Sequence, residues 1–154
     1  MALAAAQVVD AVAARIKGVG VTDSGERVYT SRAWPLKDLP AWRVVAEEED
    51  IEALTMHTPA LLQHVLRVAV QGNAEAVSDL DDNLNGLASQ ALSAIFSLTP
   101  PADALAALGG KVKSFVPVAI ARDFAGEGQA RLGQVKVTLQ ATFQTMSNAP
   151  DVLV

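Results

Sequence analysis

The segment RLGQVKVTLQATFQT (residues 131–145) decides the fold of this chain. Its odd positions from 133 to 143 read Gly, Val, Val, Leu, Ala and Phe, whereas the even positions between them read Gln, Lys, Thr, Gln and Thr. A period of two held this long is typical of a strand with one buried and one solvated face. The segment KVKSFVPVAIARDF (111–124) alternates as well and is joined to it through the turn AGEG (125–128). The two segments are therefore predicted to form an antiparallel hairpin.

Three more strands are predicted upstream of this hairpin, at residues 27–34, 41–49 and 61–72. The third of them places five mainly apolar side chains on one face: Leu62, His64, Leu66, Val68 and Val70. An amphipathic helix is predicted over residues 2–17, where Gly18 and Gly20 end it. A short helix is expected at 101–110, after Pro100 and Pro101, and the tail SNAPDVLV (147–154) is expected to be loose.

The stretch SDLDDNLNGL (78–87) has two possible interpretations. From Asp81 it reads D-x-N-x-N-G, the first half of a calcium-binding EF-hand loop, but position 12 of such a loop, a bidentate Glu, is Leu92 here. An apolar stripe also runs through it at helical spacing: Val77, Leu80, Leu84, Leu87, Ala91 and Ile95. We therefore predict a helix over 74–97, with Asp81 near the edge of the stripe, where it could meet another surface.

Together these elements predict an α+β fold in one domain spanning residues 1–154. We expect a single mixed or antiparallel sheet of about five strands with two main helices packed on one face. Hydrophobic residues make up 51% of the chain and charged residues 19%, which is typical of a globular protein with a real core.

The net charge of −5 and the scattered basic residues argue against sequence-specific nucleic acid binding. No segment is apolar for long enough to predict a membrane span. The absence of cysteine excludes thiolate metal sites and cysteine nucleophiles and fits a cytoplasm as the place of assembly.

No group of residues predicts catalysis, a metal site or a cofactor. His57 and His64 are seven residues apart with Pro59 between them, so on a strand they would face opposite sides. His64 lies among apolar residues and is more typical of a hydrogen-bonded core histidine than of a base. The chain carries neither a G-x-S-x-G elbow nor a phosphate-binding glycine loop. We therefore expect a protein that is not an enzyme.

The segment WPLKDLPAW (34–42) is the strongest candidate for a contact with a partner. It is a loop stiffened by two prolines, and Trp34, Leu36 and Trp42 are large apolar residues of the kind enriched in interfaces. The alternative is that both tryptophans fold back onto the core. The candidate contact residues are thus Trp34, Leu36, Trp42 and Asp81.

Across most of its length the chain resembles the tail terminator, or tail-completion, proteins of long-tailed bacteriophages. The segments that carry the resemblance are VVDAVAARI (8–16), VYTSRAWPL (28–36), LPAWRVVAEEEDIE (39–52), VAVQGNAEAVSDLDDNLNGLASQALSAI (68–95) and RLGQVKVTLQATFQT (131–145). The resemblance implies a structural subunit of the virion that forms a ring, a hexamer in this family. The ring caps the head-proximal end of the tail tube and offers a surface to the head. Its partners would be the tail tube protein and a head-side connector protein. A ring needs two unlike patches on each subunit, and the long terminal hairpin and the loop WPLKDLPAW are two candidates for them.

A second hypothesis is a small adaptor without enzymatic activity. Such a protein would bind a peptide or ligand on its sheet and would act as a monomer or dimer. The mass of the protein in solution separates the two hypotheses, because only the first requires a ring.

Overall fold

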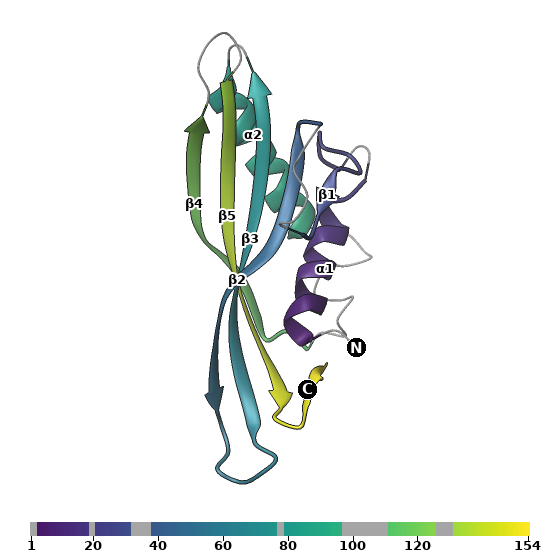
Figure 1. Ribbon diagram of the computed structural model, residues 1–154, viewed down its shortest axis with the longest axis vertical. Coiled ribbons are helices and arrows are strands. Elements are labelled where there is room, and N and C mark those ends of the chain that lie inside the picture. Colours follow the sequence, from purple (N-terminus) through teal and green to yellow (C-terminus); the bar gives the residue numbers. More distant parts are fainter. Residues whose placement is uncertain (1–2, 19–20, 32–37, 77–78, 97–110, 126–130) are drawn as a thin grey trace.

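The computed structural model describes residues 3–18, 21–31, 38–76, 79–96, 111–125 and 131–154 (Figure 1). These residues form an α+β fold of two helices and six strands, which confirms the predicted fold class. In chain order the elements are α1 (Ala4–Ile16), β1 (Val28–Tyr29), β2 (Ala41–Ala53), β3 (Leu61–Ala76), α2 (Leu80–Ile95), β4 (Ser114–Ala125), β5 (Arg131–Met146) and β6 (Ala149–Leu153).

One mixed sheet contains all six strands. Its order is β1-β2-β3-β5-β4, and β6 pairs with the end of β5. Only β1 and β2 run parallel, and every other pair is antiparallel. The long pair at its centre is β3 with β5, which stay in register from Leu61 opposite Met146 to Ala76 opposite Arg131. The sheet is strongly twisted, so that the order of β2, β3 and β5 across the picture is reversed between the two ends of Figure 1.

The predicted alternation of β5 is confirmed, because its odd residues build the core. Val135, Val137, Leu139, Ala141 and Phe143 are all fully buried, and Leu66, Val68 and Val70 of β3 are buried beside them. Residues of both helices belong to the same buried cluster. Each fully buried aliphatic side chain contributes about 1.5–3 kcal/mol to folding, so this face of the sheet holds the helices in place.

The helix α1 has an apolar face of seven buried residues and is tied to its neighbours by two side chains. Arg15 donates from Nε to the carbonyl of Ala94 in α2 at 3.1 Å. Gln7 donates from Nε2 to the carbonyl of Asp151 in β6 at 2.6 Å. The helix ends before Gly18, whose φ of +134° suits glycine alone.

The helix α2 runs without a break through the stretch that resembles half of a calcium loop, so the predicted helix is confirmed there. Leu84, Leu87, Ala91 and Ile95 of the predicted stripe are buried. Asp81 and Asp82 lie in the first turn, where negative charge interacts favourably with the helix dipole.

Several boundaries differ from the prediction. Residues 74–76 belong to β3 and not to the helix, because β5 extends to Arg131 and pairs with them. The predicted strand 27–34 is reduced among the described residues to β1, and the strand 41–49 extends to Ala53. The tail is not loose: it forms β6, whose Leu153 is buried in the core. The predicted helix at 101–110 lies outside the described residues.

The predicted hairpin of 111–124 with 131–145 is confirmed as β4 and β5, but β4 lacks the expected buried face. Phe115 is buried, whereas every residue from 116 to 124 is exposed. The reason is that α2 packs on β3 and β5 and reaches the outer strand only at its surface, where Asn85 accepts from Arg122.

Gly72 has a packing role that can be tested. It lies opposite Trp42 in the register of β2 with β3, and a Cβ on Gly72 would come within 2.7 Å of the Trp42 ring. We expect Gly72→Ala to lower the free energy of unfolding by about 1–3 kcal/mol, as measured by urea denaturation, because the buried ring cannot move aside.

The matched control is Gly86→Ala in α2, where a Cβ meets nothing within 4 Å. This substitution should raise the free energy of unfolding by up to about 1 kcal/mol, because alanine is the better helix former. Equal effects of the two substitutions would contradict the close packing of Trp42 on Gly72.

Candidate assembly surface

Among the described residues, β4 is an edge strand of the sheet. It pairs with β5 on one side, and among the described residues no strand pairs with its other side. We call residues 116–124 (VPVAIARDF) the open edge. Four of its large apolar side chains, Val116, Val118, Ile120 and Phe124, are 44–51% exposed. A long apolar edge of this kind is a ready template for another strand.

Only part of the open edge carries the features that usually protect an edge strand. Pro117 lacks a backbone donor, and the register of β4 on β5 shifts between Pro117 and Ala119, as at a β-bulge. Beyond this point the charged residues are Arg122 and Asp123. Arg122 is held at the surface by Asn85 of α2, to whose Oδ1 it donates from Nε at 3.0 Å and from Nη2 at 2.8 Å. Residues 119–121, between the register shift and these charges, carry no such protection, whereas near the end of the edge the Phe124 N–H already donates to Oδ1 of Asp123 at 3.0 Å.

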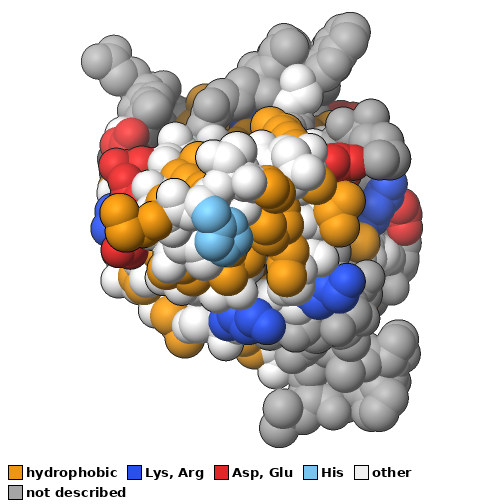
Figure 2. Space-filling model, turned by 90° about the horizontal axis from the view of Figure 1, so that it is seen from below, with side chains coloured by type: hydrophobic (Ala, Val, Ile, Leu, Met, Phe, Trp, Pro, Cys, Tyr) orange, Lys and Arg blue, Asp and Glu red, His pale blue; other side chains and the backbone are white. Residues whose placement is uncertain are grey.

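The second uncovered feature is an arm (residues 47–65) formed by the end of β2, the loop 54–60 and the start of β3. It extends past the helices at the lower end of the molecule (Figure 1). The burial of β2 stops at Val45, next to a register shift between Ala46 and Glu48, and all its later residues are exposed. Ile51, Leu54 and Met56 are exposed apolar side chains on the arm. Seen from the end at which the arm points, the molecule presents hydrophobic side chains around an exposed histidine (Figure 2).

A buried histidine anchors the arm to the rest of the sheet. His64 is 6% exposed, and its ring stacks on Phe143 of β5 with centroids 4.8 Å apart. Its Nδ1 lies 2.5 Å from Oε1 of Glu49 in β2, and its Nε2 lies 2.7 Å from Oγ1 of the buried Thr145 in β5. A carboxylate only accepts, so Nδ1 carries the hydrogen, and in the neutral ring Nε2 accepts from the hydroxyl. His64, Glu49 and Thr145 thus link β3, β2 and β5 at the point where β2 leaves the core. His64 is a buried, hydrogen-bonded histidine, as the sequence predicted.

The charges of the arm are only partly neutralised. Glu47 forms an ion pair with Lys136, and Glu48 lies 3.9 Å from Arg67. Asp50 and Glu52 are exposed, and no basic side chain of the described residues pairs with either. The edge of β2 on the arm is therefore acidic, whereas the open edge on β4 is apolar.

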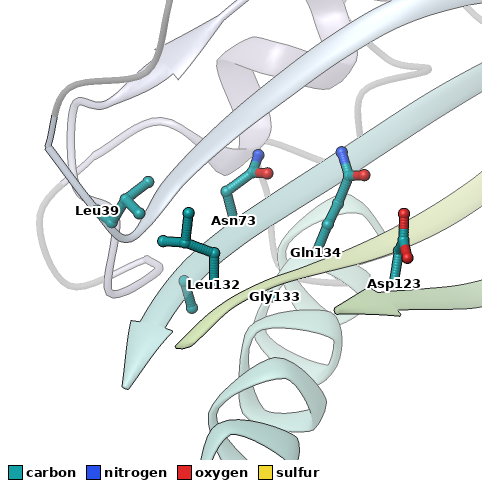
Figure 3. Close-up of a pocket in the computed structure, with 7 residues that line it drawn as sticks. Leu39, Asn73, Asp123, Leu132, Gly133 and Gln134 are labelled. Carbon is teal, nitrogen blue, oxygen red and sulfur yellow. The ribbon is translucent and has the colours of Figure 1, made fainter. Parts of the chain in front are cut away.

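A hollow of about 290 Å³ lies at the opposite end of the sheet. Asn73, Gln134 and Asp123 are register neighbours across β3, β5 and β4, and they line it on the sheet face opposite α2 (Figure 3). Leu39 and Leu132 provide its apolar wall. The hollow could hold a small polar group or a side chain of a partner, and it contains no histidine or serine for catalysis.

The four residues that the sequence predicted as partner contacts have different outcomes in the structure. Trp42 is fully buried on Gly72, so the core interpretation holds for it, and this corrects its nomination as a contact. Trp34 and Leu36 lie outside the described residues. Asp81 is exposed in the first turn of α2, so its contact with a partner stays a prediction.

Sequence reasoning named the terminal hairpin, which contains β4, as a candidate ring contact, but it predicted neither the exposure of both faces of β4 nor the arm. Both segments alternate or carry charges like ordinary strands, and only the placement of the helices leaves them uncovered. The run EEED (47–50) was the one available signal, because consecutive acids on a strand are not expected inside a core.

Two negative findings concern the described part of the chain. Within it, no three side chains of His, Asp or Glu gather closely enough to hold a metal ion. Its two helices are also too short or too polar to cross a membrane.

The hydrogen bond between His64 and Thr145, which anchors the arm, can be tested by its contribution to stability. We expect Thr145→Val to lower the free energy of unfolding by about 1–3 kcal/mol in urea denaturation, because His64 Nε2 would be buried without a partner. Thr142→Val is the control, since Thr142 is half-exposed on the solvated face of the same strand, and its effect should stay within about 0.5 kcal/mol. Equal losses for both variants would show that the hydroxyl does not hold the histidine.

Comparisons with known proteins leave the family of the chain open. No protein-family model matches it, and no curated protein matches it. Among solved structures it is similar to a chain of the "Virion of native gene transfer agent (GTA) particle", at 14% sequence identity and a TM-score of 0.49. The match covers 93% of this chain and 96% of that chain. A likeness of this degree carries no argument about what the present chain does.

Proposed function

We propose that this chain is a structural protein of a bacteriophage virion and forms the ring that terminates the tail. In this proposal the ring caps the head-proximal end of the tail tube and presents a joining surface to the head. The single observation that carries the proposal is the open edge of β4. Nine consecutive residues are exposed there, including four large apolar side chains on a strand without a second partner strand among the described residues.

A protein that works as a monomer seldom leaves such an edge free, because it invites pairing with other chains. A ring needs a heterologous contact, in which one patch meets a different patch on the next subunit. The open edge and the acidic arm are two such unlike patches on one chain. The segments that resemble tail terminators include both β5 and the β2 half of the arm, which gives the proposal its specific form.

The elongated shape suits a subunit with two axial partners. The tip of the arm lies at one end of the long axis, and the ends of β3 and β5 that line the hollow lie at the other (Figure 1). With that axis along the axis of the ring, one end would meet the tail tube protein and the other a head-side connector. A net charge of −5 would let DNA pass through the ring without binding to it. No enzymatic activity belongs to this role.

The second candidate function is an adaptor that binds a ligand on its sheet as a monomer or dimer. The hollow favours it, because the carboxamide and carboxylate groups of Asn73, Gln134 and Asp123 stand side by side on one face of the sheet, beside apolar walls. An adaptor does not require the open edge to be covered by a ring neighbour.

The mass of the protein in solution distinguishes the ring from the adaptor. For the ring we expect light scattering to give a species near six times the 16.1 kDa of one chain, at high concentration or in the presence of tail tubes. Negative-stain images should show rings, and rings at one end of each tube. Monomers or dimers under every condition, with tubes present, would refute the ring and favour the adaptor.

A variant of the open edge provides the matched control. Ile120→Lys with Phe124→Lys should leave the circular dichroism spectrum unchanged, since both side chains are already exposed, and should abolish the ring. Val152→Lys with Val154→Lys adds the same two charges on comparably exposed valines, one in β6 and one just after it, and should keep the ring. Loss of the ring in both variants would point to net charge rather than to the edge.

A further inference from the structure

We infer that the arm of one copy of this chain docks along the open edge of β4 in the next copy. This inference rests on the proposed ring and deepens it by naming the two surfaces that meet. The occupant of the open edge is thus a second copy of the same chain, and the pairing segment is the exposed edge of β2 within the arm, residues 47–53.

The first support is the backbone of the two edges. Residues 47–53 pair with β3 on one side, and no described strand pairs with them on the other. The open edge likewise pairs with β5 on one side, and no described strand pairs with it on the other. Seven strand residues extend about 23 Å and nine extend about 30 Å, so the arm fits within the length of the edge. Pairing would satisfy the outward backbone donors and acceptors of both strands.

The second support is the apolar surface on both partners. Ile51 and Leu54 are 57% and 43% exposed on the arm, and Met56 is fully exposed at its tip. Ile120 and Phe124 offer a matching surface on the side of β4 that faces toward α2 without being covered by it. Docking would remove apolar area from water on both chains, which is the main favourable term in association.

The third support is the charge at the two surfaces. Asp50 and Glu52 of the arm have no ion-pair partner among the described residues. Lys111 and Lys113 precede β4, are exposed and likewise lack an acidic partner there. In an antiparallel docking the start of β4 lies beside the end of β2 on the arm, which brings the two lysines toward the two acids. A second β4 would bring only one acid, Asp123, together with the neighbouring Arg122, so charge favours the arm over pairing of two open edges.

Charge reversal in two populations tests the inference. The arm variant carries Asp50→Lys and Glu52→Lys, and the edge variant carries Lys111→Glu and Lys113→Glu. Each variant alone should stay monomeric in sedimentation velocity, because its arm and its edge have the same sign of charge. The two variants mixed should associate, since each arm then meets an edge of opposite sign, and added salt should weaken this association.

Cross-linking locates the contact. Because the chain has no native cysteine, an introduced cysteine is the only thiol that can react. One population carries Glu48→Cys on the arm, and a second, differing in mass by a tag, carries Ala121→Cys on the open edge, because an antiparallel docking places the start of the arm strand beside the end of β4. Each chain has a single thiol, so a short thiol-specific cross-linker can join only two chains. We expect products between the populations and none within either. Ala14→Cys on the exposed face of α1 is the control and should cross-link with neither.

The outcomes separate this inference from the proposed ring. Rings that cap tubes without cross-links between arm and edge would overturn the inference and leave the proposed function standing. Cross-links within the Ala121→Cys population alone would replace the arm by a second β4 and overturn it as well. Cross-links between arm and edge in open chains that never cap a tube would support the inference and refute the terminator. Monomers throughout, with tubes present, would overturn both.

Discussion

The antiparallel pairing of β5 with β3 is the interaction on which the rest of the structure depends. These two strands stay in register over their whole length, and their inward side chains form the floor of the core. Both helices are held by that floor, because its residues and the apolar faces of α1 and α2 form one buried cluster. The place of every outer strand then follows from the two central ones.

The helices leave most of β4 and the arm uncovered, and this limit creates the surfaces that we assign to assembly. The helix α2 lies on β3 and β5, so β4 beyond them keeps apolar side chains in solvent. The burial of β2 likewise stops at Val45, and the strand continues as the acidic edge of the arm. A longer or broader pair of helices would bury both features and leave a self-sufficient monomer.

The arm differs from a mobile loop because it is built into the sheet. His64, Glu49 and Thr145 connect β2, β3 and β5 at its base, and the stacking of His64 on Phe143 links this polar cluster to the core. Groups held in this way lose little further freedom on docking, which lowers the entropic cost of association.

The sequence by itself determined the α+β class, the alternation of β5, the apolar stripe of α2 and the core position of His64, because each depends on a local period or a local chemistry. It left Trp42 undecided between core and surface, and it placed residues 74–76 in the helix and the tail in solvent. Only the tertiary structure decided these points, since they depend on partners distant in sequence: Gly72 receives the Trp42 ring, β5 captures the end of β3, and β5 and α1 hold β6. The exposure of β4 and of the arm was decided in the same way, because whether an apolar strand is core or interface depends on what covers it.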